Sequence, residues 1–205
     1  MTVRYRQIAA LLIGTVLGSV LLMLSGFSVP DIDRFKEGKP SLSLAEFFAG
    51  ETIAYGIFED RFGQLKRQFR VHIDGRTEQG KLILDEQFLY DDGEQAQRIW
   101  TITSTQTKDG FIRYEGSADD VTGTATGKAA GNVLSWSYDI ELAIGDNDIE
   151  VRFDDFIYQM SDNLAINRAH VTKWGVELGT VTLVFLRGKL AQSELADNNF
   201  QLERW

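Results

Sequence analysis

Regular alternation of apolar and polar residues, unbroken by proline between Thr52 and Gly188, is the feature that most limits the fold of this chain. Successive side chains of a β-strand point to opposite faces of the sheet, so alternation predicts strands with one dry face and one wet face. The segment 133–144 is the clearest example. We expect one of its faces to point into a core, and that face carries Leu134, Trp136, Tyr138, Ile140 and Leu142.

Turn-forming pairs such as Asp74-Gly75, Asp109-Gly110 and Gly131-Asn132 separate the alternating segments. The strands are expected near residues 52–60, 65–74, 81–90, 95–106, 111–117, 122–130, 133–144, 148–159, 164–173 and 178–187. We predict an all-β fold, an antiparallel up-and-down barrel of about ten strands that is lipocalin-like, because closure leaves no exposed edge. A two-sheet sandwich is the alternative, although it usually has longer crossovers.

One short helix is expected between the N-terminal segment and the strands. Ser43 and Glu46 match a capping box and Gly50 is a stop signal, which predicts one short helix at residues 44–49. The tail, residues 189–205, has only weak helical character.

The N-terminus has the pattern of an export signal. Arg4 and Arg6 precede an apolar run from Ile8 to Leu24, which is long enough to cross a bilayer. Phe27 follows Leu24-Ser25-Gly26, at the position where a bacterial lipoprotein carries its acylated cysteine. We therefore expect an uncleaved single-pass anchor in the inner membrane with the rest of the chain in the periplasm. A cleaved signal and a free periplasmic protein is the alternative.

These boundaries divide the chain into three parts. Residues 1–27 are expected to form a signal anchor or transmembrane helix, and residues 28–42, which hold both prolines, a linker. Residues 43–205 are expected to form one periplasmic β-barrel domain.

Composition excludes several classes of function. The net charge is −9 and the sequence has no basic stripe, which argues against nucleic acid as a partner. No cysteine is present, so disulfides and thiolate metal sites are excluded. His72 and His170 lack convergent ligands at metal spacing, and we predict neither a metal nor a cofactor.

No pattern supports an enzyme. The sequence has no Gly-x-Ser-x-Gly or His-Glu-x-x-His motif. Asp154 and Asp155 are adjacent, but on a strand they point to opposite faces and cannot share a proton. Asp155 is on the inner face and needs a partner there, so a structural role is expected for it. We predict no catalytic residue.

Several motifs spread over the exported part resemble one family. They are Phe62-Gly63, Tyr90-Asp91-Asp92-Gly93-Glu94, Arg98, Trp100, Tyr114-Glu115-Gly116, Asp120-Val121, Gly123, Gly127, Gly131-Asn132, Trp136, Tyr138, Phe153-Asp154-Asp155-Phe156, Asn167, Lys173-Trp174-Gly175 and Gly179. The pattern is similar to the proteobacterial lipoprotein family of domain of unknown function 3833. The resemblance implies no activity. Phe27, Phe156 and Ile157 depart from the family pattern, and Phe27 removes the site of lipid attachment.

Three charged residues fall in the inward phase of consecutive strands: Arg67, Glu86 and Arg98. Hairpin pairing would set both arginines opposite or diagonal to Glu86. One guanidinium would then be left over and would need a partner. It would either receive the carboxylate or phosphate head of an amphipathic ligand, or join Asp155 or another carboxylate in a structural network, or reach the rim. The full set of expected ligand-binding residues is Arg67, Glu86, Arg98, Trp100, Tyr114, Trp136 and Tyr138.

Three functions fit these expectations. The first is an envelope-associated barrel that binds a small apolar or acyl-chain ligand, such as a lipid or fatty acid. The second is an envelope interaction protein with a solid core and no ligand. The third is a lipid-modifying enzyme of unknown reaction.

Overall fold

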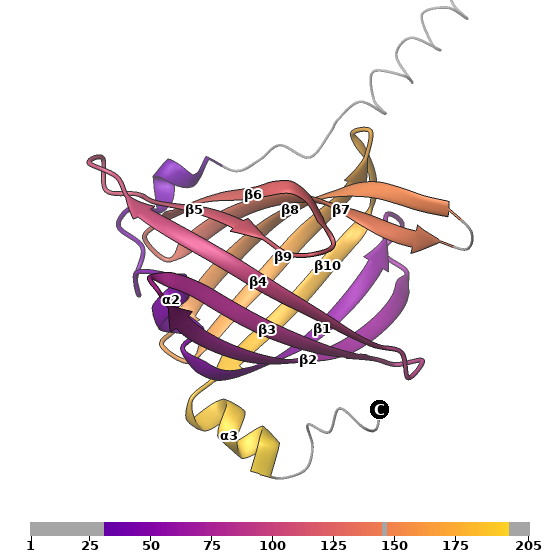
Figure 1. Ribbon diagram of the computed structural model, residues 1–205, viewed down its shortest axis with the longest axis horizontal. Coiled ribbons are helices and arrows are strands. Elements are labelled where there is room, and N and C mark those ends of the chain that lie inside the picture. Colours follow the sequence, from indigo (N-terminus) through magenta and orange to yellow (C-terminus); the bar gives the residue numbers. More distant parts are fainter. Residues whose placement is uncertain (1–30, 145–146, 197–205) are drawn as a thin grey trace, which may run out of the picture.

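Ten antiparallel strands close into a barrel in the computed structural model, which describes residues 31–144 and 147–196 (Figure 1). The strands are β1 (Gly50–Asp60), β2 (Leu65–Glu78), β3 (Lys81–Tyr90), β4 (Gln95–Gln106), β5 (Ile112–Ser117), β6 (Val121–Ala130), β7 (Val133–Ile144), β8 (Asn147–Ser161), β9 (Leu164–Lys173) and β10 (Val176–Arg187). The predicted all-β barrel of about ten strands is confirmed.

Each strand pairs with its neighbours in sequence, and β10 pairs with β1 to complete the circle. The closing register runs from Thr52 opposite Arg187 to Asp60 opposite Gly179. This pairing joins the two ends of the strand series and leaves no open sheet edge, so the sandwich alternative does not hold.

The alternation in β7 sets the inner face as expected. Leu134, Trp136, Tyr138 and Ile140 are all buried in the main core; the side chain of Leu142 lies outside the described ones. Trp136 fits because two neighbouring strands carry glycine beside it. A Cβ at Gly116 or Gly127 would lie 2.8 Å or 2.5 Å from the indole ring, so the glycines of β5 and β6 make room for a large residue of β7.

The helix α2 (Leu44–Phe47) closes one end of the barrel (Figure 1). Leu44, Phe47 and Phe48 are buried there, and the ring of Phe48 packs edge-on against Phe185 at 5.2 Å. The backbone of Phe48 also passes close to β2. A Cβ at Gly75 would lie only 1.7 Å from the carbonyl oxygen of Phe48. The predicted short helix is therefore confirmed, and it serves as a plug.

The segment expected to be a linker is packed in part against the barrel. The 3-10 helix η1 (Ile32–Phe35) buries Ile32 against Phe111 and Ala130, and Leu42 enters the main core. Lys128 reaches Asp33 at 2.8 Å. The proline and charge pattern gave no indication of this docking, because the apolar residues that anchor it are isolated in the sequence.

The helix α3 (Lys189–Ala196) follows β10 and packs on the outside of the barrel, with Ala191 against Ile53. The Tyr55 hydroxyl donates to Glu194 at 2.7 Å. No helix among the described residues is long and apolar enough to cross a membrane. The expected signal anchor at residues 1–27 lies outside the described residues.

Candidate functional site

A cavity of about 130 Å³ lies inside the barrel, beyond the plug. Its walls are mainly aromatic and aliphatic, and five polar side chains point into it. The residues that line it include Glu86, Phe88, Arg98, Trp100, Trp136, Tyr138, Phe153, Asp155, Asn167 and Leu183. This space argues for the ligand-binding alternative over the one with a solid core.

The aromatic wall is a packed set of rings. Trp100 lies edge-on to Trp136 at 5.6 Å and to Tyr138 at 5.3 Å, and Tyr138 stacks on Phe153 at 5.3 Å. Each ring comes from the inward phase of its strand, so the period-2 pattern of the sequence places all of them. These rings give the cavity a rigid apolar surface.

Glu86 and Arg98 face each other across the β3–β4 hairpin, where they are directly opposite in register. Arg98 is held by Asp120: its Nε lies 3.0 and 2.9 Å from the two carboxylate oxygens, and its Nη2 lies 2.5 Å from Oδ2. This is a bidentate pair of the strongest kind. Asp120 therefore neutralises Arg98, and no spare guanidinium is left in the cavity.

Asp155 is buried on β8 and accepts a hydrogen bond from Nδ2 of Asn167 at 2.5 Å. The expected partner for this inward carboxylate is thus present on β9. Its second oxygen, Oδ2, has no hydrogen bond of ordinary geometry, and Oδ1 of Asn167 also lacks one. Both residues line the cavity, so they present unsatisfied acceptors to it.

Burial dominates the acid–base behaviour of the cavity. It raises the pKa of Glu86 to about 7, against the opposing effect of Arg98. It raises the pKa of Asp155 to about 6, although hydrogen bonds from Asn167 and Tyr138 act in the opposite direction. Burial, followed by the charge of Asp155, keeps the pKa of Tyr138 well above its usual value, so the phenol stays neutral.

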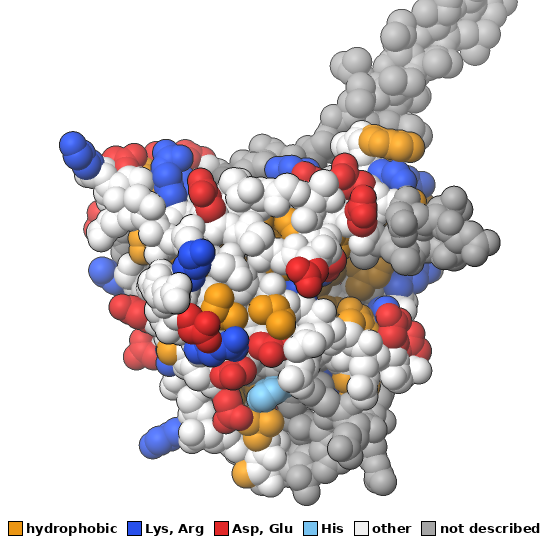
Figure 2. Space-filling model, in the orientation of Figure 1, with side chains coloured by type: hydrophobic (Ala, Val, Ile, Leu, Met, Phe, Trp, Pro, Cys, Tyr) orange, Lys and Arg blue, Asp and Glu red, His pale blue; other side chains and the backbone are white. Residues whose placement is uncertain are grey.

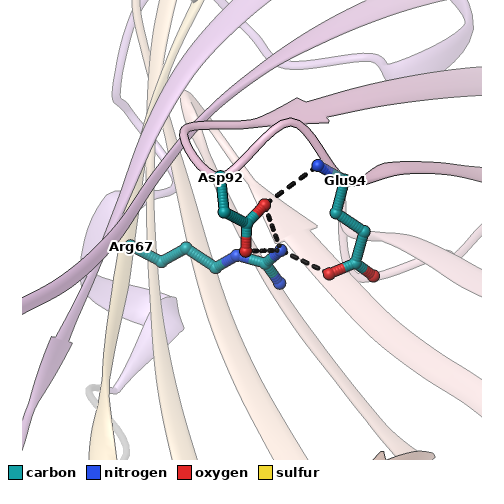
Figure 3. Close-up of polar contacts among 3 residues, drawn as sticks. All are labelled: Arg67, Asp92 and Glu94. Carbon is teal, nitrogen blue, oxygen red and sulfur yellow. Dashed lines mark hydrogen bonds and ion pairs between the residues drawn. The ribbon is translucent and has the colours of Figure 1, made fainter.

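Arg67 lies at the mouth of the barrel and not in the cavity (Figure 3). Its Nη2 donates to both oxygens of Asp92, at 3.0 and 2.8 Å, and to Glu94 at 2.5 Å. The guanidinium also stacks over Tyr90 at 3.6 Å. The predicted contact between Arg67 and Glu86 is wrong, and the alternative in which one arginine reaches the rim describes the structure.

The length of one hairpin explains this correction. The sequence suggested a turn at residues 75–80, but β2 continues to Glu78, which pairs with Lys81. Phe69 then pairs with Tyr90, and Glu86 pairs with Ile73. Because the turn is short, Arg67 lies beyond Phe69 at the mouth of the barrel and away from Glu86, which it was expected to contact.

Of the seven predicted ligand-binding residues, five line the cavity: Glu86, Arg98, Trp100, Trp136 and Tyr138. Tyr114 does not; its hydroxyl accepts the backbone N–H of Leu44 at 3.2 Å and so anchors the plug. Two important residues were missed in that set. Asp120 lies in the turn before β6, where the alternation of the sequence does not predict to which face a side chain points. Asn167 could have been predicted, because it is a polar residue on the inward face of β9.

The outer surface carries both signs of charge. Figure 2 shows acidic and basic side chains interspersed on the face in view, with no basic stripe. Within the described part of the chain, no group of three or more His, Asp or Glu side chains could hold a metal ion.

A model of the family described as "Protein of unknown function (DUF3833)" matches residues 21–187. The chain belongs to this family. The family resemblance seen in the sequence motifs is thereby confirmed. A search of curated protein sequences found no match.

The fold of this DUF3833 member is similar to that of the S-type phycobiliprotein lyase CPES from Guillardia theta. The TM-score is 0.54 at 10% identity, over 78% of this chain and 99% of that chain. A de novo designed fluorescence-activating β-barrel is less similar, with a TM-score of 0.38 at 12% identity over 72% of this chain and 99% of that chain. Lobster apocrustacyanin A1 gives a TM-score of 0.35 at 12% identity, over 84% and 83% of the two chains. The lyase comparison shows a shared fold and no more.

Proposed function

We propose that this barrel binds a small, mostly apolar ligand in its central cavity. The observation that carries the proposal is the aromatic-lined space of about 130 Å³ with a few convergent polar groups at Glu86, Arg98 and Asp155. Ligand sites in proteins combine these two properties. A packed structural core would have filled the space and left no unsatisfied acceptor beside it.

The cavity volume limits the ligand. An apolar protein cavity of about 150 Å³ takes up benzene, so the space here suits one ring or the end of an acyl chain. A longer ligand would extend past Arg98 toward the mouth, where Arg67 and Tyr90 lie.

A second function, an enzyme, is favoured by one observation. Burial raises the pKa of Glu86 to about 7, which is the range of a general acid or base at neutral pH. The shared fold with a protein named as a lyase is compatible with catalysis, but no second group in the cavity is placed as a nucleophile. We therefore keep binding as the main proposal.

The test is a cavity-filling substitution with a matched control. Small molecules retained by the full-length chain would be extracted and identified by mass spectrometry, from the wild type and from Leu183→Phe and Val184→Phe. Leu183 lines the cavity, whereas Val184 lies in the opposite phase of β10. Loss of a retained molecule from Leu183→Phe alone is expected. Equal retention by all three folded proteins would disprove binding in the cavity.

Location in the cell envelope is a separate proposal that rests on the sequence. It is supported by Arg4 and Arg6 before the apolar run from Ile8 to Leu24. N-terminal sequencing of the protein extracted from membranes tests it. An intact N-terminus is expected for an uncleaved anchor, and a mature chain that begins near Val29 would contradict the anchor.

A further inference from the structure

The charge balance of the cavity is negative. Among the residues that line it, Glu86 and Asp155 are acidic and Arg98 is the one basic residue. Arg98 already has a bidentate partner in Asp120. Two carboxyl groups therefore share the electrostatic influence of a single cation that is already paired, and a carboxylate ligand would add a further like charge.

Among the described residues, the buried side-chain atoms of the cavity that lack a hydrogen bond are both acceptors. Asp155, only 4% exposed, has an Oδ2 without a hydrogen bond of ordinary geometry, although Tyr138 lies close enough to lower its pKa, and the neighbouring Asn167 has an Oδ1 without a hydrogen bond. An unpaired buried acceptor is costly, and a ligand that donates a hydrogen bond to it removes that cost. A ligand that only accepts hydrogen bonds would leave both oxygens unsatisfied.

The walls suit a cation as well. Trp100, Trp136, Tyr138 and Phe153 surround the space, and the faces of aromatic rings attract ammonium groups. Burial raises the pKa of Glu86, and a positive group beside it would stabilise the ionised form that burial disfavours.

We propose that the cavity selects ligands with an apolar body and a protonated amine, and that the ammonium group binds between the carboxylates of Asp155 and Glu86. This inference rests on the proposed function, because it specifies the ligand class of the same site. It replaces the expectation of a carboxylate or phosphate head bound by an arginine, since Asp120 occupies the guanidinium that would have received it.

Four probes that share one ring test this selectivity: benzylamine, benzyl alcohol, toluene and benzoate. Binding to the full-length chain would be measured by NMR titration at pH 7, followed through the indole N–H signals. We expect benzylamine to bind most tightly and benzoate most weakly. A charge-assisted hydrogen bond corresponds to a difference on the order of tenfold or more in affinity.

Asp155→Asn and Glu86→Gln should each reduce the affinity for benzylamine relative to that for toluene by on the order of tenfold or more. Asp154→Asn is the matched control, because Asp154 is on the outer face of β8, where the hydroxyl of Ser137 donates to it. Retained toluene binding shows that each variant keeps its cavity.

The outcomes separate the two proposals. Benzoate binding as tightly as benzylamine, or benzylamine binding that is unchanged in both variants, overturns the amine selectivity and leaves a ligand-binding barrel. No binding of any of the four probes, toluene included, removes the proposed function and the selectivity together.

Discussion

At the scale of single residues, Glu86 makes the stability of the fold depend on pH. Its pKa is about 7 in the folded protein and near its usual 4.5 in the unfolded chain. Between these values the folded protein keeps a proton that the unfolded chain has lost. The free energy of unfolding therefore falls as the pH rises from about 4.5 to about 7. Glu86→Gln should make the free energy of unfolding fall less steeply with pH. Chemical denaturation at several pH values measures this, and a dependence on pH unchanged from the wild type would contradict the burial of this carboxyl group.

Trp136 and Ser137 provide a second comparison between neighbouring residues. Trp136 is buried against Trp100, so Trp136→Ala should cost about 3–5 kcal/mol. A domain of this size loses roughly 2–4 °C in Tm for each kcal/mol. Ser137 lies on the outer face and donates to Asp154 at 2.6 Å, so Ser137→Ala should change Tm little. Calorimetry on both variants checks this, and similar losses would mean that the strand faces are reversed.

At the scale of elements, the plug is held by one side chain that was expected to bind ligand. Tyr114→Phe removes the acceptor for the Leu44 N–H and should reduce the free energy of unfolding by about 1 kcal/mol. Because Tyr114 does not line the cavity, the affinity for a bound probe such as toluene should not change. Urea unfolding and NMR titration measure the two quantities, and a large loss of affinity with unchanged stability would return Tyr114 to the binding site.

A substitution at Gly75 of β2 tests how firmly α2 is seated against the barrel. Gly75→Ala would place a methyl group 1.7 Å from the carbonyl oxygen of Phe48, so the plug must move away from β2. We expect a drop in Tm of several degrees, while Thr77→Ala, on the exposed end of the same strand, should have almost none. An unaltered Tm for Gly75→Ala would show that α2 is not firmly seated.

Most elements could be predicted from the sequence because alternation is a local signal. The bounds of β3, β4, β7 and β9 agree with the expected ranges. The docking of η1 could not be predicted, because it depends on tertiary contacts of single apolar residues. The same holds for the site. Alternation along β3 and β4 predicts that Glu86 and Arg98 point inward. The position of Arg67 depends on the length of the turn after Glu78, and Asp120 lies in a turn, where alternation predicts no direction.

At the scale of the whole molecule, closure makes the last strand essential. β10 pairs with both β1 and β9, so a chain that ends at Gly175 should not fold. A chain that ends at Gly188 loses only α3 and the tail and should keep the barrel. Circular dichroism of the two truncated chains decides the matter, and a cooperative unfolding transition in the shorter one would contradict the role of closure.

The pairing of β1 with β10 also has a consequence during synthesis. The ribosome makes β1 early, but its partner on one side is complete only at Arg187. At about 5–20 residues per second, the intervening chain takes on the order of ten seconds to appear. For that interval the nascent chain presents an unpaired strand edge to other nascent chains and to chaperones. A finished barrel with no free edge is therefore preceded by a growing chain that has one.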